Sequence, residues 1–121
     1  DSRDLLTLWL CGLPSLDRTL RMHQHAPLLI RVSERVQLDP LERDPFVAAI
    51  DHGLRAAGAT QKLLSDSALE LLFRASRGVL RLAARILRLA LEAAHERDQN
   101  FVDDPAMDAA IDQVITKKAA P

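Results

Sequence analysis

Arg81 lies where a charged side chain could bind phosphate. It follows Gly78 in the segment Ala75–Leu82, between two helical patterns. A glycine can end a helix in a left-handed conformation, so the next helix is predicted to begin at about Val79 and to carry Arg81 in its first turn. A helix N-terminus is already partly positive and binds anions, which makes a nucleotide phosphate the natural ligand of this arginine. The alternative is a surface arginine beside an ordinary helix end.

Four more arginines extend this feature into a stripe. With Arg81 they recur at spacings of three and four, which places them along one side of two successive helices: Arg74, Arg77, Arg85 and Arg88. No acidic residue interrupts the sequence between Arg74 and Arg88. Part of the stripe could face the nucleotide, while Arg85 and Arg88 could contact a DNA backbone. A solvated charged face is the alternative.

Other reactive residue types form no recognisable catalytic or metal site. His23 and His25 are two residues apart and would face different sides of a helix, so no metal site is expected. Cys11 is expected to be a small buried residue. Asp103 and Asp104 are expected to cap a helix rather than to act as a catalytic pair.

Composition indicates a single domain with a preference for helices. The chain has 121 residues, of which 48% are hydrophobic and only 3% aromatic. A net charge of -1 gives no general attraction to nucleic acid or membranes, so any such contact needs a local patch. The single cysteine excludes an internal disulfide and fits a reducing cytoplasm. No apolar run approaches the roughly 20 residues that cross a bilayer, so no membrane association is expected.

Two β-strands are predicted ahead of the helices. The apolar run Leu5–Cys11, which ends at Gly12, is typical of a strand buried on both faces. Glu34–Leu38 is the second candidate and ends at Asp39. Two strands cannot bury the first one. Either the first run is not a strand, or the chain is the C-terminal part of a larger α/β protein.

Helical periodicity accounts for the rest of the chain. A helix is predicted from Leu16 to about His25, with Ser15 as its N-cap and Pro27 as an interruption. About four helices follow from Leu41 onward. The first of them is expected to end at Gly58. The second is expected to begin at Ser65 or Ser67, with a capping box to Glu70, and to end at Gly78. The last is expected to begin at Asp103 or Asp104, just before Pro105. The expected buried stripes are Phe46, Val47, Ile50 and Leu54; Leu69, Leu72 and Phe73; Leu80, Ala84, Leu87, Leu91 and Ala94; and Met107, Ala110, Ile111 and Val114.

Short motifs in a fixed order carry a family resemblance over about Leu5 to Val114. They are Gly12-Leu13-Pro14-Ser15-Leu16, His25 through Arg31 and Arg35 to Leu38-Asp39-Pro40-Leu41, Leu54 to Ala59, Leu64 to Leu69, Ala75-Ser76-Arg77-Gly78, Arg81-Leu82 and Ala90 to Ala94. Their order and spacing resemble the AAA+ ATPases of the transposition-helper and secretion-pathway ExeA type.

The resemblance implies a mainly α fragment. Residues 1–41 would be the C-terminal remnant of the nucleotide-binding core, with the last two β-strands of an α/β P-loop fold. Residues 42–116 would form the helical lid, and residues 117–121 a flexible tail. No G-x-x-x-x-G-K-[ST] motif occurs in the sequence, so this chain alone is not expected to hydrolyse ATP. In such ATPases the P-loop and the magnesium-binding strand precede this region.

The resemblance also assigns roles to single residues. Arg31 matches the arginine finger that reaches the γ-phosphate in a neighbouring subunit, which makes it the expected catalytic residue. Arg81 with Gly78 matches the sensor-2 element, which contacts the bound nucleotide. Leu13 stands at the sensor-1 position and cannot hydrogen bond, so Ser15 is the candidate substitute.

The sequence therefore predicts part of an ATP-binding AAA+ protein that assists DNA transposition. Its longer parent would bind ATP and Mg²⁺, form a homo-oligomer and engage a transposase and DNA. Two alternatives stay open. One is a secretion-pathway ATPase of the same fold, and the other is a non-enzymatic helical module that binds a protein partner.

Overall fold

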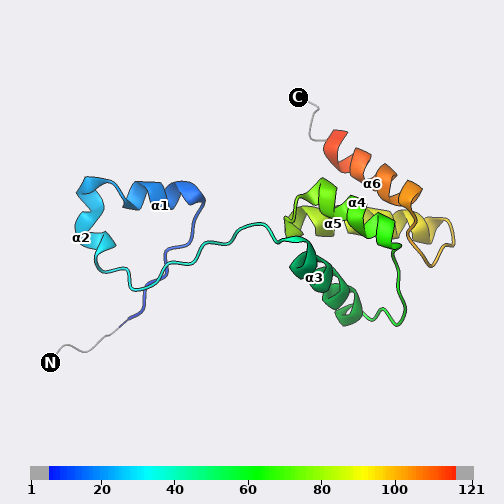
Figure 1. Cartoon of the computed structure of the whole chain (residues 1–121), viewed down its shortest axis with the longest axis horizontal. Coiled ribbons are helices and arrows are strands. Elements are labelled where there is room, and N and C mark those ends of the chain that lie inside the picture. Colours follow the sequence, from blue (N-terminus) through cyan, green and yellow to red (C-terminus); the bar gives the residue numbers. More distant parts are fainter. Residues whose placement is uncertain (1–5, 117–121) are drawn as a thin grey trace. The chain divides into compact units, whose positions relative to one another are not determined.

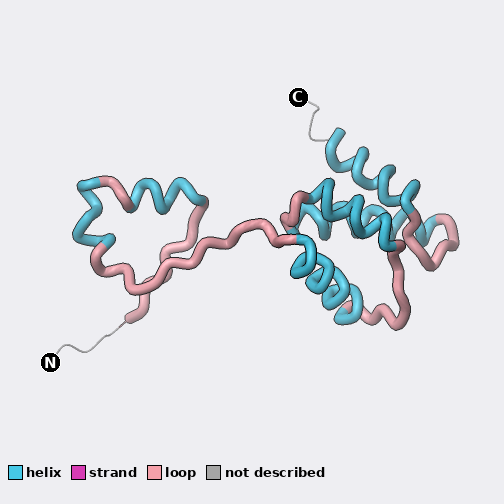
Figure 2. Tube along the Cα trace, in the orientation of Figure 1, coloured by secondary structure: helices cyan, strands magenta, loops and turns pink. Residues whose placement is uncertain are grey.

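The computed structural model describes residues 6–116, and the regular elements within this range are all helices (Figures 1 and 2). The mainly helical class is confirmed. The chain divides into two units, Asp1–Leu38 and Asp39–Pro121. The assignment of residues 1–41 to a core remnant and of 42–116 to a lid stays a prediction, and the expected tail at 117–121 lies outside the described residues.

The two expected strands do not form in the described part of the chain. Residues 6–13 and 32–42 have no regular secondary structure. Leu6, Leu8 and Trp9 are 78%, 71% and 82% exposed, and Cys11 is exposed rather than buried. A strand requires hydrogen-bonding neighbours, and no described segment pairs with these residues. The prediction of two strands and of a buried Cys11 is therefore wrong for this structure.

The first unit carries three short helical elements. They are α1 (Pro14–Leu20), the 3-10 helix η1 (His23–His25) and α2 (Ala26–Leu29), and none of them contains a buried residue. The expected single helix with Ser15 as its N-cap is wrong. The N-cap of α1 is Leu13, because Pro14 suits the first helical position, where the missing N–H costs nothing. Pro27 lies in the first turn of α2 for the same reason.

Four longer helices form the second unit, as predicted. They are α3 (Arg43–Ala56), α4 (Asp66–Ser76), α5 (Leu80–Glu96) and α6 (Asp104–Thr116). In Figure 1, α4, α5 and α6 lie together, and α3 meets them near its N-terminus. They share one buried core: Phe46, Ile50, Leu64, Ala68, Leu72, Ala83, Ile86, Leu87, Ala90, Ala94, Val102, Ala106, Met107, Ala110 and Val114.

The buried face of α5 differs from the predicted one. Leu87 and Ala94 are buried as expected, but Leu80 and Ala84 are exposed. Ala83, Ile86 and Ala90 take their places in the core. Small alanine side chains allow helices to approach closely, so the face richest in buried alanine packs against α4 and α6. The expected inner face of α6 is confirmed, with Met107, Ala110 and Val114 buried and Ile111 partly buried.

Side-chain caps fix the starts of α4 and α6. The Ser65 hydroxyl accepts a hydrogen bond from the Ala68 N–H at 2.9 Å, and the Asp103 carboxylate accepts one from the Ala106 N–H at 3.0 Å. Ser65 and Asp103 are thus the caps among the alternatives left open by the sequence. Ser67 lies inside α4, so the predicted capping box from Ser67 is wrong.

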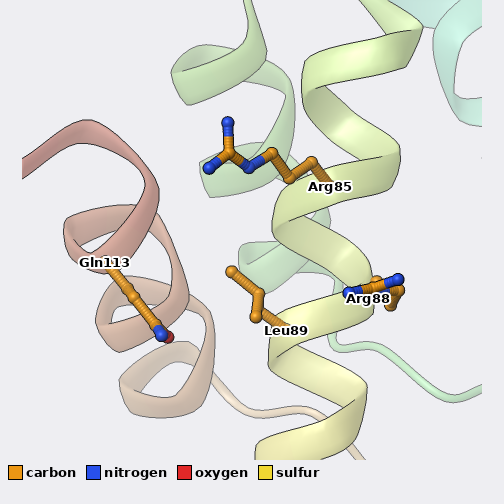
Figure 3. A pocket seen from close by; sticks show the side chains of 4 residues that line it. All are labelled: Arg85, Arg88, Leu89 and Gln113. Carbon is orange, nitrogen blue, oxygen red and sulfur yellow. The ribbon is translucent and has the colours of Figure 1, made fainter. Parts of the chain in front are cut away.

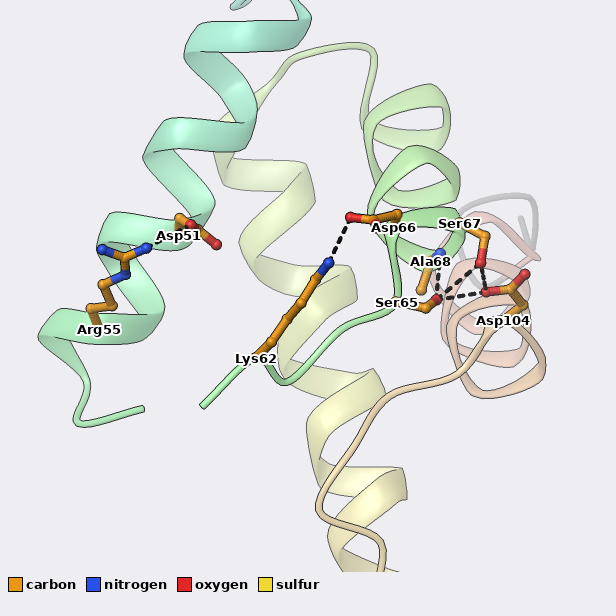
Figure 4. A network of polar contacts seen from close by, with 8 residues as sticks. All are labelled: Asp51, Arg55, Lys62, Ser65, Asp66, Ser67, Ala68 and Asp104. Carbon is orange, nitrogen blue, oxygen red and sulfur yellow. Dashed lines mark hydrogen bonds and ion pairs between the residues drawn. The ribbon is translucent and has the colours of Figure 1, made fainter. Parts of the chain in front are cut away.

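The two helix starts are also tied to each other. A parallel bridge joins Leu64 to Val102 just ahead of the caps. The hydroxyls of Ser65 and Ser67 both donate to the Asp104 carboxylate, at 2.9 Å and 2.6 Å (Figure 4). Asp104 therefore connects α6 to α4 instead of capping its own helix.

The turn between α4 and α5 is left-handed at two successive residues. Arg77 ends α4 with a φ of 52°, and Gly78 follows with a φ of 76°. Gly78 is buried, and its carbonyl accepts a hydrogen bond from the Leu41 N–H at 3.0 Å. A Cβ at position 78 would overlap the Leu41 carbonyl. The predicted left-handed turn is confirmed, and this close approach explains why a glycine stands there.

Replacing Gly78 with alanine is expected to lower the free energy of unfolding by about 2–3 kcal/mol, because the side chain meets both the overlap with Leu41 and an unfavourable φ. Gly53→Ala is the matched control. Gly53 lies inside α3, and there is open space where a Cβ would be added. The free energy of unfolding of this variant should therefore rise by about 0.5–1 kcal/mol. Urea unfolding of both variants measures the difference, and equal stability would contradict the proposed overlap.

Candidate phosphate-binding arginines

The arginine stripe lies on the exposed side of the second unit. Arg74 is in the last turn of α4, Arg77 ends that helix, and Arg81, Arg85 and Arg88 follow on α5. All five side chains are exposed. On α5 their spacing of three and four puts them on the face opposite the buried alanines. The structure thus places Arg81, Arg85 and Arg88 on one exposed face of α5, and it exposes Arg74 and Arg77 at the end of α4.

Most of this stripe has no counter-charge. The Nε of Arg88 lies 3.3 Å from Glu92 Oε1. Across residues 6–116, no ion pair engages Arg74, Arg77, Arg81 or Arg85. No Asp or Glu occurs from residue 71 to residue 91. The stripe is therefore a locally positive surface on a chain whose net charge is -1.

Arg81 and Gly78 have different surroundings. Arg81 is the second residue of α5, exposed at the helix start where anions are favoured. Gly78 is buried against Leu41, and its carbonyl is already hydrogen bonded. This packing role was not evident from the sequence, because it depends on a residue far away in the chain. By fixing the turn ahead of α5, Gly78 sets where this helix begins and so where Arg81 lies.

A hollow of about 150 Å³ lies between α5 and α6 beside the stripe. Its lining residues are Arg85, Arg88, Leu89 and Gln113 (Figure 3). Arg85 and Leu89 extend from α5 on the side where α6 carries Gln113. Gln113 was not predicted from the sequence, because it comes to line the same hollow as Arg85 only through the packing of the two helices.

A second hollow, of about 550 Å³, lies on another side of the same unit. Its wall includes the apolar side chains of Ile50, Leu54, Leu63 and Leu69. The basic residues there are already paired. Arg55 binds Asp51 at 3.1 Å, and Lys62 binds Asp66 at 2.7 Å, which lowers the pKa of that carboxyl through a hydrogen bond (Figure 4). Paired cations are less available to an anionic ligand than those of the arginine stripe.

Arg31 lies in the other unit, in the turn that follows α2. Its N–H donates to the Leu28 carbonyl at 3.0 Å, and its side chain is exposed. Downstream, Arg35 Nη1 lies 3.8 Å from the Asp17 carboxylate of α1. The Asp17 carboxylate also receives the Nε of Arg21 at 2.7 Å. These contacts tie the segment after Arg31 back to α1.

The remaining candidates stay untested predictions. Leu13 is 77% exposed, and Ser15 lies in the first turn of α1. Among residues 6–116, no group of three or more potential ligands that could hold a metal ion includes His23 or His25. No helix in that range is long and apolar enough to cross a membrane.

Comparison with known proteins gives one informative likeness. The chain is 35% identical to General secretion pathway protein A of Aeromonas hydrophila over 102 residues, which cover 84% of this chain. The two proteins are distantly related. The chain spans about a fifth of the length of that relative, since the match covers 19% of it. No protein-family model matches the chain. No solved structure matches it either.

The ion pairs of Asp17 lead to a pH-titration prediction. The hydrogen bond from Arg21 is the main cause that lowers the pKa of Asp17, with a smaller contribution from the charge of Arg35. Arg21→Gln should therefore raise this pKa toward its ordinary value, as measured by NMR of the carboxyl carbon. Arg18→Gln removes the same charge from the same helix without an ion pair to Asp17 and should leave its pKa unchanged. Identical titration of the two variants would contradict these contacts.

Proposed function

We propose that this chain is the C-terminal part of the ATP-binding AAA+ module of a secretion-pathway ATPase. The observation that carries the proposal is the 35% identity to General secretion pathway protein A across 84% of the chain. The ordered motifs and the mainly helical structure support it. In this proposal residues 1–41 belong to the nucleotide-binding core and residues 42–116 form its lid. The longer protein supplies the P-loop and binds ATP and Mg²⁺.

Arg81 is proposed to contact the nucleotide as the sensor-2 residue. It is exposed, it has no carboxylate partner within the described residues, and it lies in the first turn of a helix. A guanidinium in this position can form two parallel hydrogen bonds to phosphate oxygens. Gly78 contributes indirectly, because its contact with Leu41 fixes the turn from which Arg81 projects.

Arg31 is proposed to act as the arginine finger of a homo-oligomer. Its side chain is exposed, and it follows a short helix in a unit separate from that of Arg81. An arginine presented to a neighbouring subunit stabilises the negative charge that develops on the transferred phosphoryl group. It contributes little to binding of the ground-state nucleotide, so its loss is a loss of turnover.

Assistance of DNA transposition is the second candidate, with a transposase and DNA as partners of the longer protein. It is favoured by one observation: Arg85 lacks an ion pair within residues 6–116 and, with Arg88, belongs to a face without acidic residues up to residue 91. Such a face suits a phosphate backbone. The likeness to a secretion-pathway protein favours the first candidate over this one.

Two variants of the longer protein test the nucleotide roles. Arg31→Ala should keep ATP affinity nearly unchanged and lower turnover by roughly 10³-fold or more, as loss of an arginine finger does. Arg81→Ala should weaken ATP binding by about tenfold or more, because a charge-assisted phosphate contact is lost. Fluorescent-nucleotide titration and steady-state phosphate release measure the two quantities separately.

Mixing provides the decisive control for Arg31. Combining the Arg31→Ala protein with a P-loop variant should restore part of the turnover, because each subunit supplies what the other lacks. Failure of every mixture to recover activity would argue against action across a subunit boundary. If the longer protein bound no nucleotide at all, the non-enzymatic helical module would be the better description.

Arg97→Ala is the control for both arginine variants. It removes an exposed arginine at the far end of α5 and should behave like the unmodified protein.

The DNA candidate predicts a change in salt dependence. Replacing Arg85 and Arg88 together with alanine should weaken binding to duplexes of any sequence to a similar extent. The slope of log affinity against log salt should flatten by about one unit per lost phosphate contact. Titration of the longer protein onto a fluorescent duplex at several salt concentrations measures this slope, at a fixed concentration of an ATP analogue. An unchanged slope would mean that both arginines belong to a solvated charged face and do not contact DNA phosphates.

A further inference from the structure

The hollow between α5 and α6 combines two kinds of hydrogen-bond donor. Arg85 comes from α5 and Gln113 from α6, with Leu89 as the apolar wall (Figure 3). Arg88 completes the lining, but its Nε is already engaged by Glu92 at 3.3 Å. None of the lining residues carries a carboxylate. A concave site with donors on two sides and no acidic group selects an anion.

Arg85 supplies the charge of this site. It has no ion-pair partner in the part of the chain that the structure describes. Arg81 and Arg88 stand one turn away on either side, so their charges add to the positive potential around it. A guanidinium presents several N–H donors in a rigid plane, which matches the oxygens of a tetrahedral or planar anion.

Gln113 supplies a neutral donor from the second helix. Its side-chain amide carries two N–H donors, and the residue is exposed on α6 while Ala110 and Val114 beside it are buried. These residues belong to the same core as Ala90 and Ala94 of α5. The two helices are therefore fixed relative to each other before any ligand arrives. A site that needs no rearrangement of its backbone loses less entropy on binding.

We propose that this hollow binds a single phosphate group, with Arg85 as the charged donor and Gln113 as the second donor. The volume of about 150 Å³ suits one such group. It is smaller than the roughly 300–1,000 Å³ of sites that enclose a whole small-molecule ligand. The proposal rests on the phosphate-contacting role of Arg85 in the second candidate function. The phosphate is that of a nucleic-acid backbone or free inorganic phosphate, which share this chemistry.

The test is a titration of the 121-residue chain with inorganic phosphate, followed by NMR of the Gln113 side-chain amide and the Arg85 Nε–H. Chloride at matched ionic strength is the reference. Saturable shifts of both groups are expected. Gln113→Glu puts a carboxylate in the hollow and should weaken phosphate binding about tenfold or more, since it replaces a donor by a like charge. Arg85→Lys keeps the charge but loses the planar donor set and should also weaken binding.

Arg97→Gln is the matched control, because it removes an exposed arginine at the C-cap of the same helix, outside the hollow. It should keep phosphate affinity within about twofold if binding is specific to the hollow. Equal losses in Arg97→Gln and Gln113→Glu would overturn the proposal, as would phosphate shifts that Gln113→Glu leaves unchanged. Circular dichroism of each variant verifies that the helices remain formed.

A parallel titration with a short DNA duplex identifies the source of the phosphate. Tighter binding of the duplex that Gln113→Glu weakens would identify a nucleic-acid backbone. Saturable phosphate shifts together with duplex binding that is insensitive to Gln113→Glu would identify a free phosphate. This result would support phosphate binding in the hollow and contradict a role of the hollow in DNA binding. The absence of phosphate shifts together with duplex binding insensitive to Gln113→Glu would overturn the proposal itself.

Discussion

The second unit depends on one close approach of backbone to backbone, between Leu41 and Gly78. The Leu41 N–H donates to the Gly78 carbonyl at 3.0 Å, and there is no room for a side chain at position 78. This contact joins the segment that leads into α3 to the turn that separates α4 from α5. It therefore fixes three helices at a single point. An ordinary residue at this turn would have to move Leu41, and with it the start of α3.

Two more contacts hold the first half of α3 near that point. The rings of Phe46 and Phe73 lie 5.2 Å apart with a tilt of 59°, and Arg43 binds Glu70 at 3.0 Å. Tilted aromatic pairs of this kind contribute beyond their buried area. Further along α3, Ile50 still packs in the core but also lines the larger hollow together with the partly buried Leu54. The N-terminal half of α3 is thus anchored, and its C-terminal half leaves space beside α4.

Local signals predicted most of the second unit. The helix caps and the left-handed turn at Gly78 depend on residues within one helical turn, so the sequence located the turn and narrowed each cap to two candidates. The structure then decided for Ser65 over Ser67 and for Asp103 over Asp104. The placement of Arg85 and Gln113 on the same hollow depends on the packing of two helices, and no local pattern in the sequence indicates it.

The prediction of two strands was wrong for a related reason. An apolar run such as Leu5–Cys11 favours a buried strand only where other strands flank it, and the described chain does not provide them. The same long-range dependence limits prediction of the site. Spacing placed Arg81, Arg85 and Arg88 on one face of a helix correctly, but it does not determine which anion they bind.

The two units differ in how firmly each can hold a functional arginine. Arg81 and Arg85 project from a helix that contributes five residues to a packed core, so their positions follow from that core. Arg31 belongs to a unit whose helices bury no residue, and Leu6, Leu8 and Trp9 of the same unit stay largely exposed. Large apolar side chains exposed close together in the sequence are typical of a contact face. An arginine finger must be positioned to well within hydrogen-bond distance of a phosphate. In the proposed ATPase, burial of that apolar surface in the complete nucleotide-binding core would therefore be the step that orders Arg31 for catalysis.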